Sequence, residues 1–210
     1  MSDPVLDTMV LQALGCGHPS GLSILFRALN VSRLRFPPEV DNQDEDSVPL
    51  ERRDRGISEF GRGLRFARRR ASDLPASEAS RYRTWLENAG QIGEYLEAGQ
   101  LVIDSLEIPG LQQRENLKAR FGIGTGEAAC LALALEDAAP AIFVSSDQNA
   151  CRVAARIGVP FLTLFDVLDR WIATTQPAST YFEEIVAGMV QARFQVPDAN
   201  LQILRAKLEE

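Results

Sequence analysis

The chain has 210 residues, of which 45% are hydrophobic and 24% charged, so it is long enough to bury one core without disulfide or metal staples. Its three cysteines form no CxxC pair, which argues against a disulfide framework and a structural zinc site and favours a reducing, cytoplasmic compartment. We expect neither secretion nor membrane insertion, because no basic leader precedes an apolar segment and no apolar run is long enough to span a bilayer. The net charge of −7 by itself disfavours a nucleic-acid partner.

The first forty residues have the pattern of a βαβ unit. Residues 5–6 predict the end of a first strand and residues 9–14 a short apolar helix, so Asp7 falls at a strand-to-helix turn. A second helix is predicted over residues 22–30, and a short strand over residues 33–36 ends at two prolines.

An arginine-rich block breaks this alternation. Residues 41–80 are rich in Arg, Asp, Ser and Gly and predict an insertion or mobile loop, in which an acidic run precedes eight arginines. Apolar residues recur inside the block at a spacing that permits an amphipathic basic helix: Phe60, Leu64, Ala67 and Ala71. The block either lies along a phosphate backbone, with Arg68, Arg69 and Arg70 as candidate contacts, or is a solvated segment balanced by its acidic neighbours.

Helices and strands alternate again from residue 78 onward. Helices are predicted over 78–98, 111–121, 128–135 and 149–157, and strands over 101–103, 141–146 and 161–164. This order implies a parallel sheet with helices on both faces. We therefore predict one domain over residues 1–168, which includes the arginine-rich insertion, and a helical C-terminal extension over residues 169–210.

Three isolated acids lie beside short apolar segments. Asp7 and Asp147 each follow a predicted strand, and Glu127 begins an apolar helix after a glycine turn, so all three are expected at one edge of the sheet. Clustered carboxylates repel one another unless a hard divalent ion holds them ionised, which predicts Mg²⁺ or Mn²⁺ and phosphodiester hydrolysis by a metal-bound water. Thr8 and Ser145 are placed to orient these carboxylates or a water. The alternative hypothesis is that the acids are ordinary helix caps, Asp147 for the helix that begins near residue 148.

The order of these motifs resembles that of the PIN-domain family, the VapC-like metal-dependent nucleases. The matching pieces within residues 4–168 are Val5-Leu6-Asp7-Thr8, Gly124-Thr125-Gly126-Glu127-Ala128-Ala129, Ser145-Ser146-Asp147 and the helix and turn of residues 150–160. The resemblance implies a three-layer α/β/α sandwich with a central parallel sheet, and a catalytic metal site at Asp7, Glu127 and Asp147. It also implies RNA as the substrate, a homodimer and, for a toxin-like ribonuclease, an antitoxin-like protein partner.

One family element differs in this chain. Similar proteins often carry a further acid shortly after the position of the two prolines, and Gln43 occupies the aligned position here. Asp44 or Glu39 is the expected substitute as a metal ligand. If neither serves, the chain is a catalytically degraded PIN-fold binding module. A DNA-directed nuclease is a further alternative, because the metal chemistry is the same for both sugars.

Overall fold

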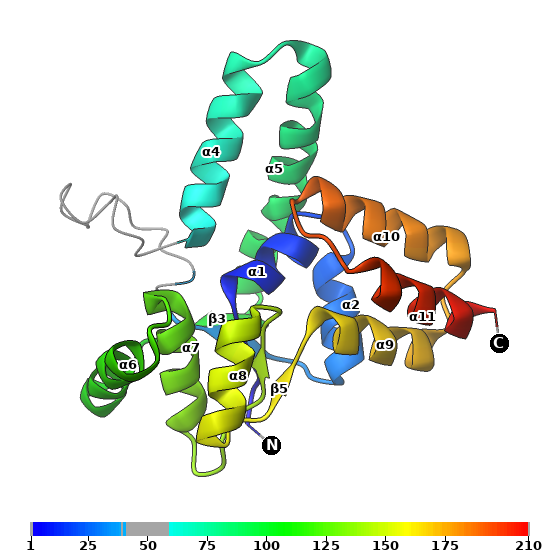
Figure 1. Ribbon diagram of the computed structural model, residues 1–210. Helices are drawn as coiled ribbons and strands as arrows, with labels where there is room; N and C mark the ends of the chain where they lie inside the picture. Colours follow the sequence, from blue (N-terminus) through cyan, green and yellow to red (C-terminus); the bar gives the residue numbers. More distant parts are fainter. Residues whose placement is uncertain (1, 39, 41–58, 210) are drawn as a thin grey trace.

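The computed structural model describes residues 2–38, 40 and 59–209 (Figure 1). Its five described strands form one parallel sheet in the order β3-β2-β1-β4-β5. The strands are β1 (Val5–Leu6), β2 (Leu34–Phe36), β3 (Leu101–Ile103), β4 (Phe143–Val144) and β5 (Phe161–Leu162). The prediction of an α/β chain with a parallel sheet is confirmed, although β4 and β5 are shorter than expected because the chain turns into helices soon after each strand.

Helices make up most of the remaining described chain. They are α1 (Thr8–Val10), the π-helix η1 (Leu11–Gly15), α2 (Gly21–Leu29), α4 (Glu59–Asp73), α5 (Ala76–Glu97), α6 (Ile108–Phe121), α7 (Thr125–Leu135), α8 (Gln148–Ile157), α9 (Leu164–Thr175), α10 (Ser179–Gln191) and α11 (Asp198–Leu208). Gly122 and Gly158 end α6 and α8 with φ of 66° and 78°, the left-handed conformation that only glycine adopts at little cost.

The strand order explains why helices cover both faces of the sheet. The chain builds β1, β2 and β3 toward one edge and then returns past β1 to add β4 and β5 on the other side. Because parallel crossovers are right-handed, this reversal places α2 and α5 on one face and α7 and α8 on the other. Figure 1 shows α6, α7 and α8 grouped on one side and α2 packed beside α9 on the other.

The three central strands, β1, β2 and β4, are buried on both faces, as expected for a covered parallel sheet. Leu6, Leu34, Phe36 and Phe143 are fully buried, and burial of each such side chain contributes roughly 1.5–3 kcal/mol. Arg35 is the charged exception on β2. Its guanidinium forms ion pairs with Asp104, at 3.3 Å, and with Asp137, which offset the desolvation of this nearly buried cation.

The described part of the arginine-rich block is a helical hairpin. Helix α4 confirms the amphipathic helix that the apolar spacing permits, and the expectation of a loop is wrong for residues 59–80, because the apolar face of α4 packs along α5. The pair projects from the body of the molecule in Figure 1. The acidic run and the first arginines, in residues 41–58, lie outside the described residues.

The C-terminal helices pack directly on the sheet domain. Helix α9 spans the predicted boundary between residues 168 and 169 and packs against α2, while α10 packs against η1 and α11 against α9. Trp171, Phe182 and Met189 belong to the same buried cluster as the strand residues. None of the helices within the described residues is both long enough and apolar enough to cross a membrane.

Candidate functional site

Asp7 and Asp147 follow two neighbouring strands, at the point in the sheet where the order in which strands are added reverses direction. β1 and β4 are neighbours in the sheet, and the connections that follow them leave toward opposite faces. The backbone N–H of Asp7 donates to the carbonyl of Val144 at 3.1 Å, so the two strand ends adjoin. In open α/β sheets, ligands bind outside the carboxyl ends of the strands at this kind of switch point.

Ser145 connects the two acids. Its hydroxyl donates to Oδ2 of Asp7 at 2.6 Å, and its Oγ accepts from the backbone N–H of Asp147 at 3.1 Å. Ser145 is fully buried and Asp7 is only 5% exposed, so the hydroxyl holds a nearly buried carboxylate in a fixed orientation. The structure thus brings together Asp7, Ser145 and Asp147.

Asp147 also caps helix α8. Its Oδ1 accepts from the backbone N–H of Ala150 at 2.7 Å, which confirms the capping hypothesis for this residue. A carboxylate has about four lone-pair sites, so capping and metal coordination are compatible on one side chain. The cap fixes Asp147 at the positive end of the helix dipole.

Glu127 lies in the first turn of α7. Its Oε2 accepts from the backbone N–H of Gly124 at 2.7 Å, as in a capping box. One turn further along α7, the Cys130 thiol donates to the carbonyl of Leu6 at 3.3 Å, at the end of β1. Helix α7 therefore packs against the end of β1, and Glu127 lies one turn before this contact.

The structure does not gather all three acids into one metal-binding group. Within residues 2–38, 40 and 59–209, no three His, Cys, Asp or Glu side chains lie close enough together to hold a metal ion. The two expected substitutes for the fourth acid, Glu39 and Asp44, lie outside the described residues.

Asp166 is a further acid at this edge that the sequence interpretation missed. The pKa of the Cys151 thiol is raised to about 11, mainly by burial and further by the negative charges of Asp147, Asp7 and Asp166. All three carboxylates are therefore close enough to this thiol to affect its pKa. Oδ2 of Asp166 accepts from the backbone N–H of Thr163 at 2.7 Å, in a capping box at the start of α9. The Thr-x-x-Asp spacing of Thr163 and Asp166, which begins inside the strand predicted over residues 161–164, could have indicated this capping box.

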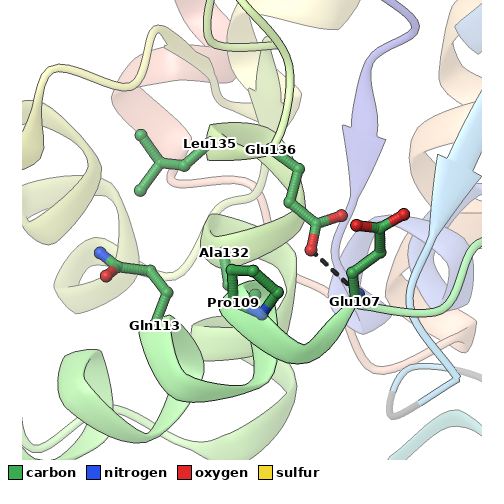
Figure 2. Close-up of a pocket in the computed structure, with 7 residues that line it drawn as sticks. Glu107, Pro109, Gln113, Ala132, Leu135 and Glu136 are labelled. Atoms are coloured by element: carbon green, nitrogen blue, oxygen red, sulfur yellow. Dashed lines mark hydrogen bonds between the residues drawn. The ribbon is translucent and has the colours of Figure 1, made fainter.

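A pocket of about 660 Å³ lies away from these acids (Figure 2). It is formed by the start of α6 and the end of α7, where Oε1 of Glu136 accepts from the backbone N–H of Glu107 at 3.1 Å. Burial and the nearby Glu107 carboxylate raise the pKa of Glu136. Because Glu136 and Glu127 are at opposite ends of α7, Glu136 lies roughly 14 Å along the helix axis from Glu127.

Comparison of the chain with protein-family models, with curated proteins and with solved structures finds no match. The chemistry of the site therefore has to be judged from its own residues. Carboxylate oxygens at one edge of the sheet, supplied by Asp7, Asp147, Asp166 and the first turn of α7, are the donors that hard divalent cations prefer. The negative charges of Asp147, Asp7 and Asp166 contribute less than burial does to the raised pKa of Cys151.

Proposed function

We propose that the chain is a Mg²⁺- or Mn²⁺-dependent nuclease with a PIN-like α/β/α domain, and that it hydrolyses phosphodiester bonds in RNA. The observation that carries this proposal is the Asp7–Ser145–Asp147 arrangement at the switch point between β1 and β4. A buried carboxylate, oriented by a buried hydroxyl beside a second carboxylate, is an arrangement suited to holding a cation at a defined position.

The residues have separate roles in this proposal. Asp7 and Asp147 hold the divalent ion, and Glu127 completes the set of ligands from the first turn of α7. Ser145 keeps the Asp7 carboxylate in position, and Thr8 lies in the next turn, where it can orient a water. A bound divalent ion would lower the pKa of the water molecule that it holds, and it would stabilise negative charge on the phosphoryl oxygens.

Cleavage by the wild-type chain and its Asp147→Asn variant tests the proposal. Asparagine is as good an N-cap as aspartate, so the variant removes a charge without removing the cap of α8. With Mn²⁺ and a panel of single-stranded RNA, duplex RNA and DNA, we expect the variant to cleave at least about 100-fold more slowly, because first-coordination ligands matter more than their supporting groups.

The matched control is Asp198→Asn, the same change in the first turn of α11. It should cleave as the wild type does. Equal cleavage by wild type and Asp147→Asn would contradict the proposal, and cleavage of DNA alone would assign the substrate to DNA.

A non-catalytic binding module is the second candidate. It is favoured by the capping bonds of Glu127 and Asp147, and by the lack, within the described residues, of a group of three metal ligands. Absence of cleavage together with unchanged heat of Mn²⁺ binding in Asp7→Asn would support this candidate, because a metal site that includes Asp7 must weaken when its charge is removed.

A further inference from the structure

Three arginines from separate segments gather around two aromatic rings of the α4–α5 hairpin. Arg70 on α4 and Arg193 after α10 lie 5.4 and 4.6 Å from the ring centre of Phe66, and Arg81 on α5 lies 4.6 Å from that of Tyr82. The two rings meet edge to face at 5.9 Å. In Figure 1 the end of α10 lies beside the hairpin, which brings Arg193 to this position. We call Arg70, Arg81 and Arg193 the arginine cluster.

The phenol of Tyr82 holds two members of the cluster. Its hydroxyl accepts from Nη2 of Arg81 at 2.9 Å and from Nη2 of Arg193 at 3.4 Å. Tyr82 itself is only 3% exposed, whereas the three arginines are exposed. The guanidinium groups of Arg81 and Arg193 are therefore held by the buried Tyr82, although both residues are exposed to solvent.

Among the described residues, no carboxylate is paired with the arginine cluster. Contact with an aromatic ring at an exposed position is weak, so it offsets only part of the repulsion among three like charges. An anionic ligand would relieve it.

The cluster adjoins the candidate site through a small pocket. Arg193 and Thr8 line a pocket of about 200 Å³, and Thr8 is the residue after Asp7. The amide of Gln12 donates to the carbonyl of Ala192 at 3.1 Å, which ties the turn that carries Arg193 to η1. Arg193 has φ of 65° at a helix end where glycine is usual, so a strained backbone presents this side chain.

We propose that the arginine cluster binds the phosphate backbone of a single-stranded nucleic acid and leads it past Thr8 toward Asp7. This inference rests on the proposed nuclease function and narrows its substrate to an unpaired strand. Guanidinium planes and aromatic rings favour single strands, since unpaired bases can stack on them while the charges contact phosphates. Of the three candidate arginines predicted from the sequence, only Arg70 belongs to the cluster, while Arg68 and Arg69 are exposed on α4.

The test is binding of a short fluorescent oligouridine RNA to the full chain in EDTA, over a series of salt concentrations. Without metal, binding is read independently of cleavage. We expect Arg193→Gln and the double variant Arg70→Gln/Arg193→Gln to bind more weakly, and to flatten the dependence of log K on log salt by about 0.7 for each phosphate that the variant no longer neutralises. Arg193→Lys, which keeps the charge, should retain most of the slope.

The control is Arg170→Gln, the same change on an exposed arginine of α9, which should bind as the wild type does. Circular dichroism of each variant verifies its fold. The inference is overturned if the wild type does not bind, if the slope is unchanged in the double variant, or if duplex RNA or polyglutamate binds as tightly as the single strand. Weakened binding in the arginine variants combined with equal cleavage by wild type and Asp147→Asn would uphold single-strand binding by the arginine cluster and reject the nuclease.

Discussion

At the level of single residues, Ser145 decides how the carboxylate of Asp7 is presented. Replacing Ser145 with alanine removes a 2.6 Å hydrogen bond to a nearly buried carboxylate. A hydrogen bond to a charged group contributes about 1.5–3 kcal/mol, so we expect Ser145→Ala to lower the free energy of unfolding by that amount in urea titrations. Ser72→Ala, at an exposed position of α4, should change it by less than about 0.5 kcal/mol. Similar losses in both variants would show that the Ser145 bond has no special role.

Tyr82 gives a pH-dependent signature of the arginine cluster. Burial raises its pKa, but hydrogen bonds and positive charge from Arg193 and Arg81 outweigh burial, so the net shift is downward. A lowered pKa in the folded chain means that the phenolate stabilises the fold above the unfolded value of about 10, and that this stabilisation is lost as the pH falls through the folded pKa.

We therefore expect Arg193→Gln to raise the pKa of Tyr82, measured by the ultraviolet absorbance of phenolate as a function of pH. Tyr82→Phe identifies its contribution among the three tyrosines. A titration that is the same in wild type and Arg193→Gln would mean that Arg193 does not contact the phenol in solution.

Among the helices and strands, the turn that follows η1 and helix α10 approach each other at two glycines, Gly17 and Gly188. A Cβ added at Gly188 would lie 2.1 Å from the carbonyl oxygen of Gly17, and the backbone on both sides is held by packed helices. We expect Gly188→Ala to lower the free energy of unfolding by about 1–3 kcal/mol, because overpacking forces the helices apart.

The control for this close approach is Gly90→Ala on α5, where nothing lies within 4 Å of the added Cβ. In a helix interior the same change should stabilise the chain by about 0.5–1 kcal/mol. Stabilisation by both variants in urea titrations would show that η1 and α10 are not in close contact.

The helices and strands themselves were largely predictable from local patterns. Apolar spacing predicted α4 inside a polar, arginine-rich block, and the short apolar run before Asp147 predicted β4. The lengths of the strands were less predictable. Residues 145–146 were predicted to extend β4, but they form the turn before α8, where Ser145 bonds to Asp7 and Asp147. The hydroxyl of Ser145 bonds to Asp7, a residue far away in the sequence, and the local pattern does not indicate this contact.

Across the molecule as a whole, the C-terminal helices and the sheet share one buried cluster. Trp171 on α9 and Trp85 on α5 are both nearly buried within it. Small domains with one core unfold in a single cooperative transition. We expect the single-tryptophan variants Trp85→Phe and Trp171→Phe each to report one transition, by fluorescence in urea. In each variant, the transition measured by fluorescence should coincide with the transition measured by circular dichroism. A separate transition reported by Trp171 would show that the C-terminal helices unfold as an independent unit.

Local sequence patterns were sufficient for the α/β alternation, the parallel sheet and the position of Asp7, Glu127 and Asp147 at the ends of strands and helices. These features follow from periodicity and capping, which depend on residues a few positions apart. Folding in three dimensions was needed to place β1 beside β4, to join Asp7 to Asp147 through Ser145, and to bring Arg193 to Phe66. Each of these contacts joins residues more than a hundred positions apart, and their proximity is set by strand order and helix packing, which no local pattern encodes.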